Sequence, residues 1–216
     1  MPALTAADAR AFADCLAGGG VAVFPADTVY GLAARAGDDA ALAHVYALKG
    51  RPAAKPAATM WFDRDAALAA LEAQAPLPPP LRRACEALLP GGVTLLLPAA
   101  APAAPAAAPQ PAAPQPAEAP ARGVRVPLLR GPLAALRDVP LAIAQSSANL
   151  AGGADPRTVA EVPASIRAGV DLVLDAGPLP GTPSTVIDLR AYARDGGWTI
   201  VREGAVPRAA VAAALG

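Results

Sequence analysis

Short apolar runs alternate with amphipathic segments along this chain, and Gly, Pro or polar residues separate them. Runs rich in β-branched and other apolar residues predict strands, whereas apolar residues at helical spacing predict helices. The alternation of the two favours an α/β layered fold. The predicted strands cover residues 21–24, 59–62, 93–97, 123–127, 141–144, 171–174, 185–189 and 198–201, and the predicted helices cover 5–16, 38–49, 64–72, 81–89, 132–136, 161–168 and 207–215.

The first strand stops at Pro25, and Asp27, Thr28 and Tyr30 follow at once, before Gly31. A strand that ends in this way projects polar side chains at the end of a sheet. We therefore expect a binding surface at this end of the sheet.

Two cations flank a glycine where the next helix ends, in Lys49-Gly50-Arg51-Pro52. Pro52 disfavours helical geometry at Arg51, so Lys49 and Arg51 are expected on an extended segment with their side chains on one face. That arrangement suits a clamp for a polyphosphate. The alternative is that both cations only complement the dipole at the helix C-terminus.

Further polar side chains fall at strand ends. Thr94 follows Gly91-Gly92 at the start of an apolar strand, where it either packs its methyl group or offers its hydroxyl to a ligand. Ser147 and Asn149 follow a buried strand and are two residues apart, so an extended chain would point both toward a ligand. The alternative is a turn held by side-chain to backbone hydrogen bonds. Similar edge positions hold Arg125, Ser184 and Arg202.

Composition narrows the class of protein. With 216 residues and 54% apolar content, the chain suits one large domain or two small ones. Its 18 basic and 18 acidic residues balance, which argues against bulk electrostatic binding of nucleic acid. The two cysteines are far apart in sequence, which favours free thiols in a reducing compartment. The chain shows no basic leader and no apolar run of membrane length, which favours a cytoplasmic protein without membrane contact. Residues 99–121 are an Ala/Pro low-complexity segment, read as a mobile surface loop.

Several chemistries are disfavoured. His44 is the sole histidine and lies within a predicted helix, which argues against a Ser-His-Asp hydrolase and against a multi-histidine zinc site. Neither GxxxxGK[ST] nor GxGxxG occurs. The polar groups at strand ends suit positioning and charge neutralisation rather than covalent catalysis.

An ordered set of motifs resembles the YrdC/TsaC family, the L-threonylcarbamoyladenylate synthases. The motifs are PADTVYGL, LKGRPxxxP, PGGVTLLLP, GVRVP, SSANLAGG, PSTVIDL and IVREGAV, and together they extend from about Leu4 to the C-terminus. The resemblance implies one YrdC-like domain over residues 1–216. Its fold would be an α/β arrangement with a twisted mixed β-sheet flanked by helices and a large concave basic cavity.

The resemblance also implies a reaction. The family makes threonylcarbamoyl-AMP and pyrophosphate from L-threonine, bicarbonate and ATP, the first step toward threonylcarbamoyladenosine in tRNA. Mg2+ would arrive with ATP, and no residue is assigned as a metal ligand. A separate tRNA-modifying transferase complex would receive the adenylate. By motif match the ATP-binding residues are Lys49, Arg51, Thr94, Ser147, Asn149 and Arg202, and the residues at the threonine or carbamate are Thr28, Tyr30, Arg125 and Ser184.

The chain departs from the family pattern at Ala26, Gly92 and Ala151, where Thr, Pro and Ser are usual, and at Met60, where many members have a histidine near the threonine site. These departures affect the expected threonine site more than the expected phosphate-binding residues. One alternative is therefore a diverged YrdC-like paralogue with another amino-acid substrate. A second is an RNA-binding module that makes weak RNA contacts through the basic cavity; it predicts steep salt dependence and no need for threonine.

Overall fold

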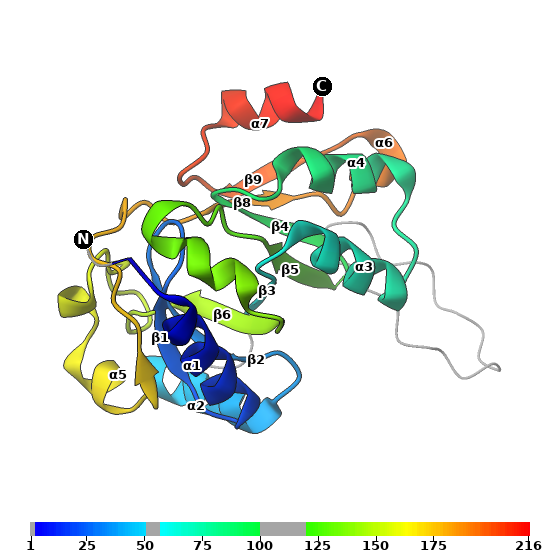
Figure 1. The fold of residues 1–216 in the computed structure, drawn as a ribbon. Coiled ribbons are helices and arrows are strands. Elements are labelled where there is room, and N and C mark those ends of the chain that lie inside the picture. Colours follow the sequence, from blue (N-terminus) through cyan, green and yellow to red (C-terminus); the bar gives the residue numbers. More distant parts are fainter. Residues whose placement is uncertain (1–2, 51–56, 100–119) are drawn as a thin grey trace.

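The computed structural model describes residues 3–50, 57–99 and 120–216 (Figure 1). Their strands form one mixed sheet in the order β7-β1-β2-β6-β3-β5-β4-β8-β9. The pairs β7–β1, β3–β5 and β4–β8 are parallel, and the other neighbours are antiparallel. The strands are β1 (Ala22–Pro25), β2 (Tyr30–Arg35), β3 (Ala58–Met60), β4 (Val93–Pro98), β5 (Ala121–Arg125), β6 (Ile143–Ser147), β7 (Leu172–Val173), β8 (Thr185–Asp188) and β9 (Thr199–Arg202).

Helices surround this sheet, which confirms the predicted α/β class with a twisted mixed sheet. They begin where the sequence supplies caps: Thr5 and Asp8 form a reciprocal capping box, and Asp38 accepts from the Ala41 amide. The helices are α1 (Ala6–Ala17), α2 (Asp39–Lys49), α3 (Arg64–Gln74), α4 (Pro79–Leu88), η1 (Gly131–Asp138), η2 (Val159–Glu161), α5 (Ala164–Ala168), α6 (Tyr192–Asp195) and α7 (Arg208–Leu215).

Two apolar clusters make up the core. One packs α1, α2, η1 and α5 against β1, β2 and β6, and contains the rings of Phe12, Phe24 and Phe62. The other packs α3, α4 and α7 against β4, β5 and β8. Figure 1 shows these two helix groups at opposite ends of the sheet. The strands β6, β3 and β5 join the two halves, so a site on these strands draws residues from both.

Several predicted boundaries were wrong. The apolar pattern predicts no strand after Tyr30, but Tyr30–Arg35 forms β2 and pairs with β1 as a hairpin. Its small residues Gly31, Ala33 and Ala34 gave no strand signal, and pairing on both sides with β1 and β6 supplies the stability instead. The strand predicted at 141–144 is displaced to Ile143–Ser147, so Ser147 ends the strand rather than following it.

Smaller differences concern short elements. The segment predicted as one helix over 161–168 is two pieces, η2 and α5, separated by Pro163, and α6 was not predicted. Ala121 belongs to β5 rather than to the Ala/Pro segment. Residues 100–119 of that segment, and Arg51, lie outside the described residues. Within the described ranges, no helix combines the length and apolarity needed to cross a bilayer.

Candidate functional site

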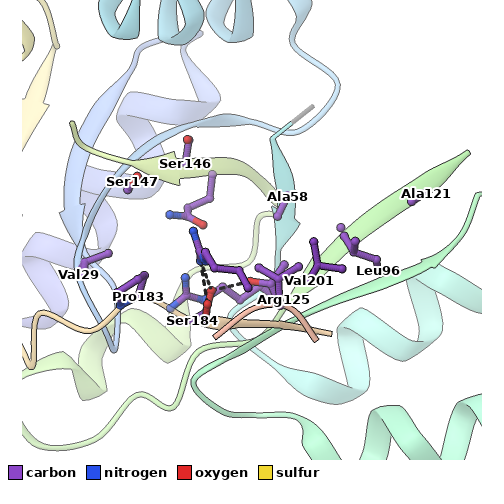
Figure 2. A pocket seen from close by; sticks show the side chains of 15 residues that line it. Val29, Ala58, Leu96, Ala121, Arg125, Ser146, Ser147, Pro183, Ser184 and Val201 are labelled. Carbon is purple, nitrogen blue, oxygen red and sulfur yellow. Dashed lines mark hydrogen bonds between the residues drawn. The ribbon is translucent and has the colours of Figure 1, made fainter. Parts of the chain in front are cut away.

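A cavity of about 510 Å³ lies against the middle of the sheet, where the two halves meet. Strands far apart in sequence supply its walls, and Figure 2 shows Ser146 and Ser147 of β6 across the cavity from Ser184, which precedes β8. Arg125 and Arg202 are the charged residues among the described side chains that line it. The cavity therefore favours an anionic ligand.

The two-residue period of the strands explains which side chains reach the cavity. On β4, Thr94 and Leu96 line it, whereas Val93, Leu95 and Leu97 pack into the core cluster of α3, α4 and α7. The same alternation places Gly123 and Arg125 of β5 in the cavity and buries Val124 in that cluster. The position of Thr94 is thus compatible with the predicted contact between its hydroxyl and a ligand, although the other residues of β4 are mostly apolar.

Three of the predicted residues form a hydrogen-bonded cluster on one wall. The Thr94 and Ser184 hydroxyl oxygens are 2.8 Å apart, and Arg202 Nη2 donates to the Ser184 carbonyl at 2.8 Å and to its hydroxyl at 3.3 Å (Figure 2). Burial lowers the pKa of Arg202, nearby Asp155 opposes that effect, and the neighbouring positive charge of Arg125 adds to it. Arg202 is exposed to solvent at the cavity, so its guanidinium is accessible to a phosphate or carboxylate.

Arg125 is held in place by the loop after β1. Its Nη2 lies 2.5 Å from Asp27 Oδ1 and 2.6 Å from Thr28 Oγ1, and the Asp27 carboxylate also accepts from the Leu128 amide. The side chains of Arg125 and Asp27 are only 3% and 7% exposed, so this is a buried ion pair. Arg125 Nε is buried and has no hydrogen-bond partner among the described residues.

Lys49, Ser147 and Asn149 also come together, behind the cavity wall. Lys49 Nζ donates to the Ser147 carbonyl, to the Asn149 carbonyl at 2.7 Å and to Asn149 Oδ1 at 3.0 Å. The Ser147 hydroxyl donates to Asn149 Oδ1, and the Asn149 amide donates to the Gly153 carbonyl. Of the three residues, Ser147 lines the cavity. Lys49 ends α2 beside Gly50, whose left-handed conformation turns the chain away from the helix.

Tyr30 is turned away from the cavity. Its hydroxyl lies 2.9 Å from Asp175 Oδ1 and 2.8 Å from the Gly177 carbonyl, and it accepts from the Ala176 amide. Burial is the main cause that raises the pKa of this phenol. The contact with threonine or carbamate implied for Tyr30 stays a prediction. Its observed role is to tie β2 to the segment after β7.

The structure therefore gathers most of the predicted residues. Thr94, Arg125, Ser147, Ser184 and Arg202 line one cavity, and Thr28 touches it through Arg125. Sequence reasoning did not assign a role to Asp27, although it lies in the polar cluster after the first strand. It also missed Gln145 and Ser146, which the displaced strand boundary concealed, and the remaining wall residues Val29, Ala58, Leu96, Ala121, Gly123, Pro183, Val186 and Val201.

The positions that depart from the motif pattern lie outside this wall. Met60 and Ala26 are fully buried in the core, with no exposed surface. Gly92 packs near Ala205 and Thr28, and the Ala151 amide donates to the Lys49 carbonyl. Among the described residues, no group of three or more His, Cys, Asp or Glu side chains is placed to hold a metal ion.

Comparison with known proteins shows which family model matches this chain. The family model for Sua5, YciO and YrdC, described as "Telomere recombination", matches residues 14–204. The threonylcarbamoyl-AMP synthase of Bacillus subtilis is 31% identical over 185 residues, which are 83% of this chain and 50% of that protein. The synthase of Rattus norvegicus is 33% identical over 198 residues, which are 88% of this chain and 64% of that protein. The chain thus spans between half and two thirds of these relatives.

Solved structures agree with the fold. Pyrococcus abyssi Sua5, crystallised in complex with L-threonine, superimposes with a TM-score of 0.77 at 26% identity, over 99% of this chain and 58% of that one. Escherichia coli YciO superimposes with a TM-score of 0.73 at 22% identity, over 97% of this chain and 96% of that one. The YciO match is evidence for the fold alone.

Proposed function

Since this chain belongs to the Sua5/YciO/YrdC family, we propose that it is a threonylcarbamoyl-AMP synthase, which converts L-threonine, bicarbonate and ATP into threonylcarbamoyl-AMP and pyrophosphate. Two curated relatives that carry this name support the proposal, as does the threonine complex of Pyrococcus abyssi Sua5. The single observation that carries it is the cavity that joins Arg125 and Arg202 to the hydroxyls of Thr94, Ser147 and Ser184.

This set of cations and hydroxyls suits the reaction because the nucleophile is made from the substrates. The amine of threonine forms a carbamate either with CO2, releasing a proton, or with bicarbonate, releasing water, and a carbamate oxygen then attacks the α-phosphorus of ATP. The bond from the α-phosphorus to the bridging oxygen breaks, and pyrophosphate leaves with that electron pair. The protein has to align the two anions and offset their charge, which needs cations and hydrogen-bond donors rather than a protein nucleophile.

The motif match supplies the proposed roles of the residues, and the positions of those that line the cavity support them. Arg202, exposed at the cavity next to Thr94 and Ser184, would offset charge on the nucleotide. Arg125, held by Asp27, binds the carboxylate of threonine or the carbamate. Thr28 and Ser184 complete the threonine side with their hydroxyls. The motif match also implies Tyr30 at the threonine, but its hydroxyl bonds Asp175 and Gly177, so its part is to hold β2 in place beside this side. Lys49, Ser147 and Asn149, with Arg51, form the phosphate side.

Mg2+ would enter bound to the phosphate oxygens of ATP, because the described residues offer no cluster of ligands for it. It would offset charge on the leaving pyrophosphate. A separate transferase is required to move the threonylcarbamoyl group to tRNA. A transient contact with that transferase and a location in the cytoplasm therefore belong to the same proposal.

Pyrophosphate release from ATP tests this function directly. Release that requires both L-threonine and bicarbonate, and that is not supported by L-serine, is the expected result. Turnover with another amino acid in place of threonine would instead identify a diverged paralogue. The names of the relatives do not favour the RNA-binding alternative, which predicts RNA affinity that falls steeply with salt and no turnover.

A further inference from the structure

A second cavity, of about 370 Å³, lies on the opposite face of the strands that carry the proposed active site. Strand β5 alternates between the two: Gly123 and Arg125 line the first cavity, whereas Arg122 and Val124 line the second. Helix α3 covers the second cavity with Leu71 and Gln74, and Trp61, just after β3, forms part of its wall. The second cavity shares only Gly123 with the first among the described lining residues.

Arg122 is the charged residue among the described side chains of this second cavity. Its Nη1 donates to the neutral Gln74 Oε1 at 2.9 Å, and its Nε is buried without a hydrogen-bond partner among the described residues. Burial lowers the pKa of Arg122. No carboxylate of the described residues forms an ion pair with it. Arg122 is only partly buried, so water offsets part of its charge, and a bound anion would supply the counter-charge that no described carboxylate provides.

Comparison with the other described arginines shows that few share this situation. Arg82, Arg125 and Arg190 are each paired with a carboxylate. Burial lowers the pKa of two arginines among the described residues, Arg122 and Arg202. Arg202 lines the proposed nucleotide cavity, where an anionic substrate supplies the missing charge. Arg122 has the same character on the other face of the sheet.

We propose that the second cavity is a binding site for a small monocarboxylate with an apolar or aromatic body. A planar guanidinium recognises a carboxylate through two parallel hydrogen bonds. The remaining wall is largely apolar and includes the Trp61 ring, Leu71 and Val124, which suits a hydrophobic body. The volume of about 370 Å³ accommodates a ligand of the size of benzoate. This inference does not depend on the proposed synthase activity.

Trp61 supplies the measurement. The chain has two tryptophans, so Trp198→Phe leaves Trp61 as the only one and makes its fluorescence a local reporter. In that background, titration with benzoate is expected to change the fluorescence saturably, with a Kd of roughly 1 mM or lower. Benzamide, which has the same shape without the charge, is expected to bind at least tenfold more weakly, that is by about 1.4 kcal/mol or more.

Matched variants separate this site from other arginines. Arg122→Gln is expected to weaken benzoate binding at least tenfold, whereas Arg83→Gln, at an exposed position of α4, leaves it unchanged. Ala70→Leu adds bulk inside the cavity from helix α3 without changing its charge, and it should also weaken binding if the ligand lies there. Circular dichroism checks that each variant is folded. A lack of saturable response, equal binding of benzamide, or wild-type affinity in folded Arg122→Gln and Ala70→Leu would each overturn the proposal.

Discussion

The carboxylate of Asp27 lies 2.5 Å from Arg125 Nη2, in an ion pair whose two side chains are almost fully buried. The two residues are 98 positions apart, and their contact joins the loop after β1 to the end of β5. Asp27 also accepts from the Leu128 amide, so it fixes both the charge and the position of the arginine that faces the proposed threonine side of the cavity.

Asp27→Asn should therefore affect both stability and activity. The substitution leaves a buried guanidinium without its counter-charge, which costs on the order of 3 kcal/mol. We expect a lower Tm, measured by thermal unfolding, and at least a roughly tenfold lower kcat/KM for L-threonine, measured by pyrophosphate release. Asp65→Asn, which breaks an exposed ion pair with Arg64, is the control and should change neither. Wild-type Tm and kinetics in Asp27→Asn would show that the pair has no such role.

Gly204 packs against the backbone that carries Ser184. A Cβ atom there would lie 2.3 Å from the Pro183 carbonyl oxygen and 2.6 Å from the Ser184 carbonyl carbon, so Gly204→Ala must displace this segment. Because Ser184 bonds Thr94 and Arg202, we expect a loss of kcat/KM of at least about tenfold and a destabilisation of about 1–3 kcal/mol.

The control for that variant is Gly18→Ala, at the end of α1. A Cβ atom at Gly18 meets its nearest neighbour at 3.4 Å, an ordinary contact, so activity should be retained. Kinetics of the two variants, combined with chemical denaturation, separate the displaced segment from a general effect of replacing glycine. Full activity in folded Gly204→Ala would show that the position of Ser184 is not critical.

The sequence predicted most of the elements, because strands and helices impose periods of two and 3.6 residues that survive in an alanine-rich chain. It did not predict β2, where small residues carry no period and pairing with β1 and β6 decides the conformation. The motif resemblance pointed to Thr94, Arg125, Ser147, Ser184 and Arg202 of the cavity but not to Gln145 or Ser146. It could not show that Lys49 bonds the backbone of the Ser147 segment, or that the Tyr30 hydroxyl points away from the cavity, because both depend on strands that are distant in sequence.

The buried thiol of Cys85 predicts a pH-dependent stability. Burial is the main cause that raises the pKa of Cys85 to about 11, from an ordinary value of 9.0. The folded state therefore favours the neutral thiol, and its contribution is fully present below pH 9 and is lost as the pH rises toward 11. The total is on the order of 2–3 kcal/mol.

Cys85→Ala removes that titration but keeps the other groups that ionise in the same range. The difference in unfolding free energy between the wild type and Cys85→Ala should therefore shrink as the pH rises from 9 to 11. Urea denaturation at several pH values measures it. A difference that stays constant over this interval would show that the thiol does not ionise more readily in the unfolded chain than in the folded one.

Lys49 joins two of the motifs and gives the sharpest test of the phosphate side. Its ammonium donates to the Ser147 carbonyl and to both the carbonyl and the side-chain oxygen of Asn149, while its own carbonyl accepts from the Ala151 amide. Lys49→Met keeps the length and apolar stem of the side chain but removes this positive charge and the three donated bonds. Because the segment that carries Ser147 would then lose its anchor, and the phosphate side would lose a cation, we expect kcat/KM for ATP to fall by at least about 100-fold. Arg10→Gln, on the exposed face of α1, is the control and should keep wild-type kinetics. If folded Lys49→Met releases pyrophosphate at the wild-type rate, neither the anchoring role nor the phosphate role can hold.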